Sequence, residues 1–273
     1  MFRDFELDRI RYKTDLINWL GWQAGYTSYL EVATETTGLM FGLISRDVFS
    51  SADRVMYRLH PKYDDGLPIW HRTALADSTE CFRALEAAGR TFDLVFVDSY
   101  HTYESSRRDL ELALERLQPG GTVVVHDCRP AKPELATPSF KEGSWLGVTY
   151  LAFLDLVNER PDLEYCVVDL DTGCGILRPR RHVTADRDRA AVDPAPARRR
   201  PPALDYRDWS VYMANQREIL NLVSVNQFLI ERRVRPIGLA AWSYHRLAPV
   251  LEATGALDHA ARMVGRIRRR MAR

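Results

Sequence analysis

The chain has 273 residues, enough for one large domain with an appendage, and a formal net charge of +1. This near-neutral balance argues against a protein built as a whole to bind polyanions. The first residues are charged and lack the apolar segment of a signal peptide, and no apolar run approaches the ~20 residues of a membrane span. We therefore expect a cytoplasmic protein. The cysteines lack Cys-x-x-Cys spacing, which predicts buried thiols.

Helices and strands alternate along the first 160 residues. Apolar spacing predicts helices at 7–25, 78–89, 103–117 and 144–160, and strands at 28–34, 53–60, 70–78, 92–98 and 122–127. Ser78 is a candidate N-cap, and Gly89 is expected to end the helix that follows it. In the run FDLVFVD at 92–98, four consecutive apolar residues precede the final acid, which is typical of a central strand of a parallel sheet.

Two further strands are expected within residues 164–178, joined by a turn at Asp171-Thr172-Gly173. A terminal hairpin on a parallel sheet makes the last strand antiparallel. The alternation predicts a doubly wound α/β fold with a mostly parallel, seven-stranded sheet. On this interpretation residues 1–179 form the main domain.

The composition changes after this domain. Proline and arginine recur in residues 180–203, which we interpret as a flexible linker. Residues 204–273 are predicted to form a helical extension with an apolar stripe that packs on the main domain or on a second subunit, which leaves a homo-oligomer open. The stripe consists of Trp209, Tyr212, Met213, Ile219, Leu220, Leu222 and Val223. The basic end is interpreted as a solvated helix terminus, so neither a nucleic acid nor a membrane is expected as partner.

Polar side chains follow the predicted parallel strands. They are Glu31 with the turn at 34–38, then Asp77 and Ser78, then Asp98, and finally His126 and Asp127. In open parallel sheets ligands bind outside the carboxyl ends of the strands, where the strand order reverses. A single acid at a strand end is often only a helix cap. Several at one edge favour a binding site.

Four stretches carry a resemblance to a known family: YLEVATETTG, LADSTECFRAL, the run from Phe92 to Cys128, and YCVVDLDTGCGILR. They resemble class I S-adenosylmethionine-dependent methyltransferases, of the branch that includes antibiotic-sugar O-methyltransferases and cephalosporin-hydroxylase-like proteins. The resemblance covers roughly residues 25–179 and implies a Rossmann-like fold. It also implies transfer of a methyl group to a hydroxyl of a sugar or another small polyhydroxylated secondary metabolite.

The resemblance also implies cofactor contacts. The loop from Glu31 to Gly38 corresponds to the part that cradles the methionine end, and Asp77 and Ser78 to the adenine side. The implied contacts are Glu31, Ala33, Thr34, Thr37, Gly38, Asp77, Ser78 and Asp98. The chain departs from the family at Ala33, where glycine is usual, and it has no obvious acid for the ribose, for which Ser45 or Asp47 could substitute.

Metal and catalytic roles follow from the same resemblance. Asp98 and Asp127 are expected to hold a divalent cation, Mg²⁺ by its preference for oxygen ligands, together with His126. Because an imidazole favours transition metals, Mn²⁺ is the alternative, and His126 could instead face the substrate. His101 fits an Asp-x-x-His pattern and is the candidate base beside Asp98. The competing interpretation is that His101 caps a helix or bonds a backbone carbonyl.

A second function is left open, that of a binding or scaffolding protein that has kept the sheet and lost catalysis. The altered first loop and the missing ribose acid favour it, whereas the set Asp98, His101 and Asp127 opposes it. Phe140 and Trp145, in the long loop after the fifth strand, could stack on an acceptor ring or belong to the core.

Overall fold

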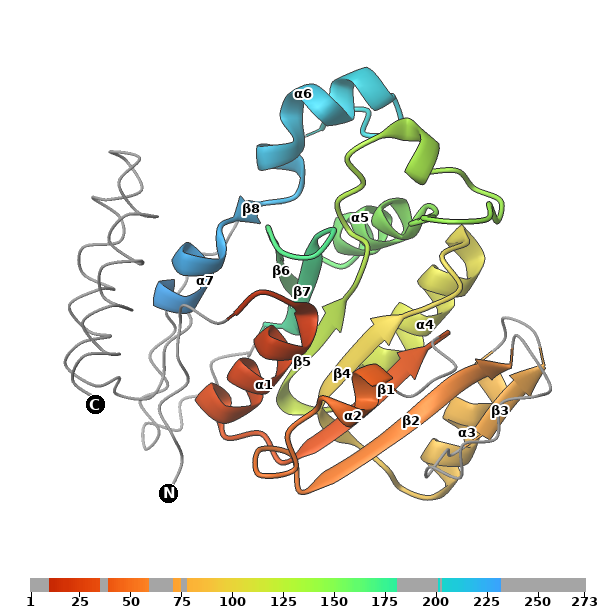
Figure 1. Cartoon of the computed structure of the whole chain (residues 1–273), viewed down its shortest axis with the longest axis vertical. Helices are drawn as coiled ribbons and strands as arrows, with labels where there is room; N and C mark the ends of the chain where they lie inside the picture. Colours follow the sequence, from red (N-terminus) through yellow and green to blue (C-terminus); the bar gives the residue numbers. More distant parts are fainter. Residues whose placement is uncertain are drawn as a thin grey trace.

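The structure of the chain, a computed structural model, describes residues 10–34, 39–58, 71–74, 78–180, 201 and 203–231 (Figure 1). Its strands are β1 (Ser28–Ala33), β2 (Ser51–Arg58), β3 (His71–Ala74), β4 (Phe92–Asp98), β5 (Leu117–Val125), β6 (Leu163–Val168), β7 (Cys174–Pro179) and β8 (Leu222–Val223). They form one sheet in the order β3-β2-β1-β4-β5-β7-β6-β8. The seven predicted strands are present, and the mostly parallel α/β fold is confirmed.

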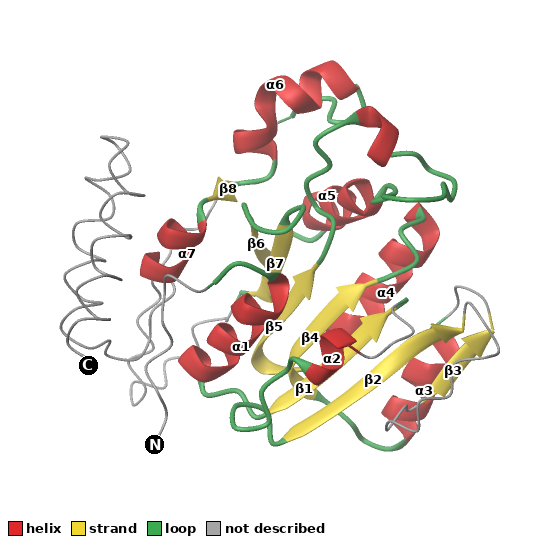
Figure 2. Cartoon of the chain, in the orientation of Figure 1, coloured by secondary structure: helices red, strands yellow, loops and turns green. Residues whose placement is uncertain are grey.

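The helices cover both faces of the sheet (Figure 2). They are α1 (Lys13–Ala24), α2 (Leu39–Gly42), α3 (Thr79–Ala87), α4 (Tyr103–Glu115), α5 (Thr149–Glu159), α6 (Trp209–Ile219) and α7 (Val225–Glu231). Helices α3, α4, α5 and α6 pack on one face, and α1, α2 and α7 on the other. This double winding explains why the apolar runs of the central strands have no polar alternation.

Strand β4 illustrates the two-sided burial. Val95 and Val97 point into the core that α4 and α5 cover, and Leu94 and Phe96 point into the core that α1 covers. All four side chains are at most 1% exposed. The apolar run therefore ends where the sheet ends, at Asp98.

The predicted hairpin is confirmed. Strand β7 runs antiparallel to both β5 and β6. Asp171, Thr172 and Gly173 have positive φ angles of 46°, 63° and 91°. A side chain at Gly173 would collide with the backbone of Arg129, so this turn requires glycine. Gly89 likewise has φ of 63° and follows α3, as expected.

Some predicted boundaries were wrong for physical reasons. Helix α5 begins at Thr149 rather than at 144, because the N–H groups of residues 146 and 147 bond the carbonyl of Leu135, and that of Val148 bonds the carbonyl of His101. Strand β5 begins at Leu117 and ends at Val125, so His126 lies in the loop beyond it. Helix α1 begins at Lys13, and the residues before Ile10 lie outside the described part of the chain.

The segment 203–231 packs against the main domain. Strand β8 pairs in parallel with β6, and Tyr212 and Ile219 of the predicted stripe are buried in the core, whereas Met213 is 41% exposed. The remainder of the predicted extension, and nearly all of the predicted linker, lie outside the described residues.

A buried carboxylate also ties this segment to α5. Asp155 accepts hydrogen bonds from the hydroxyls of Tyr206 at 2.5 Å and Tyr103 at 2.6 Å, and from the guanidinium of Arg207 at 2.6 Å. Tyr103 belongs to α4, so one carboxylate connects three parts of the chain. Because a buried charge is costly unless it is paired, these bonds are expected to matter for stability.

The four cysteines are buried free thiols, as expected. Within the described ranges, no helix combines the length and the apolar character needed to cross a membrane.

Replacing Asp155 with Ala leaves two hydroxyls and a guanidinium without their acceptor. We expect a loss of about 1–3 kcal/mol in the free energy of unfolding, measured by urea denaturation. The matched control is Asp162→Ala, because Asp162 pairs with Arg160 on the surface and is 45% exposed. This control should change stability by about 0.5 kcal/mol or less. Equal losses in the two variants would contradict the structural role of Asp155.

Candidate active site

The strand order reverses between β1 and β4, and the candidate site lies at this point. From this point the strands are added outward in opposite directions, β1-β2-β3 on one side and β4-β5 on the other. Ala33, the last residue of β1, is the register partner of Asp98, the last residue of β4. The next residue, Thr34, donates its backbone N–H to the carbonyl of Asp98 at 3.2 Å. This is the place where open α/β sheets bind ligands.

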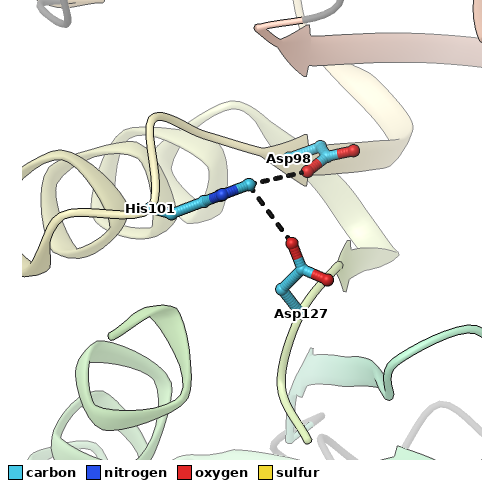
Figure 3. Close-up of side chains that lie close together, drawn as sticks. All are labelled: Asp98, His101 and Asp127. Atoms are coloured by element: carbon cyan, nitrogen blue, oxygen red, sulfur yellow. Dashed lines mark hydrogen bonds and ion pairs between the residues drawn. The ribbon is translucent and has the colours of Figure 1, made fainter. Parts of the chain in front are cut away.

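Three predicted residues meet here. The Nε2 atom of His101 lies 3.1 Å from Oδ1 of Asp98 and 3.3 Å from Oδ2 of Asp127 (Figure 3). One ligand atom from each residue lies within 4.8 Å of the others. The adjacent carboxyl ends of β4 and β5 thus bring together side chains that are distant in the sequence.

The loop before α5 fixes His101. Its Nδ1 lies 3.0 Å from the carbonyl of Trp145, and its own carbonyl accepts the N–H of Val148 at 2.9 Å. Because a carbonyl can only accept, Nδ1 carries the proton, and Nε2 faces the carboxylates. The sequence left open whether His101 bonds a backbone carbonyl or takes part in the site. In the structure it does both: Nδ1 bonds the carbonyl, and Nε2 faces the two carboxylates.

The backbone is unusual at two of these positions. His101 has a φ of 55° and Asp127 a φ of 58°, in the left-handed region that non-glycine residues seldom occupy. Such conformations cost energy and are found preferentially at functional sites. Gly147 leaves room for the backbone of His101, because a Cβ atom at position 147 would lie 2.0 Å from the carbonyl oxygen of His101.

The cluster shifts the ionisation of its members. Burial alone would raise the pKa of Asp98, but the charge of His126, the hydrogen bonds from both histidines and the charge of Lys13 hold it well below its usual range. Burial alone would lower the pKa of His101, but the hydrogen bond and charge of Asp98 and the charge of Asp127 raise it. Asp98 is therefore ionised, and the imidazolium form of His101 is favoured.

His126 lies beside this trio. Its Nδ1 is 3.2 Å from Oδ1 of Asp127 and 3.5 Å from Oδ1 of Asp98, and its Nε2 is 3.1 Å from the hydroxyl of Thr172 and 3.7 Å from Asp171. Among the described residues, Asp98, His101 and Asp127 have ligand atoms close enough together to hold a metal ion, so this group contains His101 and not His126. The structure thus brings a second histidine to the acids that the sequence linked with His126.

Lys13 is a residue of the site that sequence reasoning missed. Its ammonium lies 3.0 Å from Oδ2 of Asp98. The two residues are 85 positions apart, and the contact exists only because α1 packs on the sheet. The scarcity of lysine in an arginine-rich chain was the one available signal, and it does not point to a site.

The predicted cofactor contacts are described in part. Glu31 and Ala33 are buried in β1, and the carboxylate of Glu31 accepts the hydroxyl of Tyr29 at 3.0 Å. Ser78 occupies the N-cap position of α3, yet its buried hydroxyl donates to Asp109 instead of capping the helix. Three further predicted contacts, at Thr37, Gly38 and Asp77, lie outside the described residues.

The substitutes suggested for the ribose acid were wrong. Ser45 and Asp47 precede the start of β2 at Ser51. Ser51 donates its N–H to the carbonyl of Thr27, which precedes β1. Both suggested positions therefore approach the amino ends of the strands, on the side of the sheet opposite to the site.

Aromatic side chains surround His101. The ring of Trp145 has its centre 5.5 Å from that of His101, 5.7 Å from Tyr100 and 5.4 Å from Phe140. Trp145 is 9% exposed and donates its indole N–H to the carbonyl of Thr137 at 2.8 Å, so it is part of the packing. Phe140 is 64% exposed and offers an accessible ring next to it.

Residues 19–128 match the family model described as a methyltransferase domain. The matched stretch runs from α1 to the loop after β5 and contains Asp98, His101 and Asp127. This match agrees with the methyltransferase resemblance found in the sequence, over the part of the chain in which the strand order reverses.

No curated protein sequence matches the chain. Among solved structures, it is similar to a putative caffeoyl-CoA O-methyltransferase from Staphylococcus aureus, with 13% identity, a TM-score of 0.46 and coverage of 61% of this chain and 82% of the other. It is also similar to the O-methyltransferase TomG from Streptomyces achromogenes in complex with S-adenosylmethionine, with 16% identity, a TM-score of 0.47 and coverage of 62% and 80%.

Replacing Gly147 with Ala should disturb His101 specifically. The added methyl group meets the backbone of His101, which cannot move without displacing the imidazole. Gly143 is the matched control, because it lies in the same loop with a φ of +94° and has open space around it. We expect Gly143→Ala to cost about 1–2 kcal/mol from backbone strain alone, and Gly147→Ala to cost more.

The measurements are urea denaturation and the NMR resonances of the His101 ring. The ring resonances should shift in Gly147→Ala and stay in place in Gly143→Ala. Unchanged His101 resonances in the folded Gly147→Ala variant would refute the positioning role of this glycine.

Proposed function

We propose that the protein is an O-methyltransferase that methylates a hydroxyl of a sugar or another small polyhydroxylated metabolite with assistance from a divalent cation. One observation carries the proposal: Asp98, His101 and Asp127 converge where the strand order reverses, next to the loop after β1. Two acids and an imidazole at this position can bind an alcohol and accept its proton.

The cofactor is proposed to lie across the ends of β1 and β4. The backbone at Thr34 and the carboxylate of Asp98 are the described groups that would face its methionine end, and the short side chain of Ala33 permits a close approach. Thr37, Gly38, Asp77 and Ser78 complete the proposed contacts. When bound, S-adenosylmethionine supplies an electrophilic methyl group on a sulfonium, and its leaving group departs neutral.

The donor set fits a divalent cation. Asp98 and Asp127 each offer a carboxylate oxygen, and His126 is the imidazole donor beside them, which leaves Nε2 of His101 free to accept a proton. Carboxylates suit Mg²⁺, and the imidazole shifts the preference towards Mn²⁺. A bound cation would act as a Lewis acid that lowers the pKa of the acceptor hydroxyl.

His101 is proposed as the base. The bond from Nδ1 to Trp145 fixes the ring so that Nε2 is the atom that takes the proton from the acceptor. No acid is needed for a neutral leaving group, so one proton acceptor suffices. Asp98 orients the ring by its 3.1 Å contact and stabilises the imidazolium that forms.

The acceptor is proposed to enter beneath the loop 128–148. Lone pairs on Asp98 and Asp127 can accept hydrogen bonds from neighbouring hydroxyls, which supports a polyhydroxylated acceptor. The exposed ring of Phe140 is proposed to contact the apolar face of a sugar or an attached ring.

A binding protein without catalysis is the second candidate. Two observations favour it: the hydroxyl of Ser78 is engaged by Asp109, and Asp98 is engaged by Lys13. Such a protein would bind the cofactor or a metabolite and transfer no methyl group. Calorimetry and a transfer assay together separate the two candidates.

The test is calorimetry with S-adenosylmethionine, followed by methyl transfer to a panel of glycosides and polyols. We expect cofactor binding and transfer by the native protein. His101→Ala should keep cofactor binding and lower kcat about 10²–10⁴-fold, because only the base is lost. Glu115→Gln, a change at an exposed acid at the end of α4, is the control and should change neither property.

Failure to bind the cofactor at millimolar concentration would contradict the methyltransferase proposal. Cofactor binding with equal kcat in His101→Ala and the native protein would remove His101 from the mechanism while leaving the transferase.

The pH dependence provides a separate test. Since the base must be neutral, kcat/KM should rise with pH through the pKa of His101, which lies above its ordinary value near 6.5. Asp98→Asn removes the carboxylate that raises this pKa, so an NMR titration should place the pKa of His101 lower in the variant. In the Glu115→Gln control, His101 should titrate as in the native protein. An unchanged pKa in Asp98→Asn would contradict the electrostatic coupling.

A further inference from the structure

We propose that Lys13 is a built-in cation of the site, which holds Asp98 in competition with the divalent cation and thereby lowers the affinity of the site for metal. This inference rests on the proposed function, in particular on a metal site at Asp98 and Asp127. It gives a role to a residue that the proposed mechanism does not use.

The position of Lys13 is specific. Its ammonium lies 3.0 Å from Oδ2 of Asp98, 3.2 and 3.4 Å from the two ring nitrogens of His126, and 5.8 Å from the centre of the Phe96 ring. The side chain is only 11% exposed. A surface lysine that pairs with an acid by chance would be solvated and mobile, whereas this one is enclosed by the groups of the site.

The start of α1 is held by hydrogen bonds and by packing, and this fixes the position of the Lys13 backbone. Asp15 accepts the backbone N–H groups of Arg11 and Tyr12 at 2.9 and 3.1 Å, which defines the first turn. Leu16 and Ile17 are fully buried in the core under α1. Lys13 is the first residue of this helix and is therefore delivered to the ends of the strands.

The two oxygens of Asp98 face different cationic groups. Oδ1 faces His101 at 3.1 Å and His126 at 3.5 Å, and Oδ2 faces Lys13 at 3.0 Å. A divalent ion bound by Asp98 and Asp127 would lie within a few ångströms of the ammonium. Two like charges at that distance repel strongly in a partly buried site, where water screens them poorly.

Metal binding must therefore either displace Lys13 or tolerate its charge. Lysine has a flexible four-carbon stem and a single compact charge, so it can withdraw as a unit. In both cases part of the binding free energy of the metal is lost. The metal is therefore bound weakly and exchanges with solvent. When no ion is bound, Lys13 stays paired with Asp98.

The experiment measures Mn²⁺ binding by calorimetry and by electron paramagnetic resonance, without cofactor or acceptor. Lys13→Met removes the charge and keeps the length of the side chain. We expect it to bind Mn²⁺ at least about 10-fold more tightly than the native protein, because the repulsion is gone. Lys13→Arg keeps the charge and should bind no more tightly than the native protein.

The matched control is Lys132→Met, which removes one positive charge from an exposed position and should leave the affinity unchanged. Thermal unfolding of each variant checks that it is folded, and Lys13→Gln replaces Lys13→Met if the latter is not. Equal or weaker Mn²⁺ binding in the folded, charge-removed variant would overturn the role of Lys13 and leave the proposed function intact. Absence of Mn²⁺ binding in every protein would overturn this role together with the metal, while cofactor binding still tests the transferase separately.

Discussion

The ionised carboxylate of Asp98 is the interaction on which the site depends. It is placed at the carboxyl end of a central strand, where the sheet leaves it only partly exposed, and an unpaired charge there would be costly. His101 and Lys13 satisfy it from two sides. Because these partners belong to the loop before α4 and to α1, pairing this one charge also fixes how both segments meet the sheet.

The same physical rule operates away from the site. Asp155 gathers two tyrosine hydroxyls and a guanidinium, and so attaches the segment 203–231 to α4 and α5. Its partners are neutral hydroxyls and one cation, which leave no group free to titrate near neutral pH. The cluster around Asp98 contains two imidazoles instead, and this difference in partners suits one carboxylate to structure and the other to chemistry.

The fold and the acids of the site could be predicted from the sequence, because each has a signal within a short stretch of residues. The apolar run 92–98, the turn Asp171-Thr172-Gly173 and the strand-end acids each carry their own signal. Lys13 has none, since its role arises from the packing of α1 across 85 residues. The suggestion of Ser45 and Asp47 was wrong because a position near a strand does not say at which end of the strand it lies. The start of α5 was misplaced because helical spacing does not reveal that the preceding backbone is engaged with His101.

The central claim is that Asp98, His101 and Asp127 form one reaction site at the reversal of strand order. A crystal structure of the complex with S-adenosylhomocysteine and Mn²⁺ tests it most directly. The expected result is an anomalous peak bound by Asp98 and Asp127 beside His101, with the cofactor sulfur facing them from the ends of β1 and β4. Cofactor density elsewhere, or the three side chains turned away from a bound cofactor, would contradict the claim.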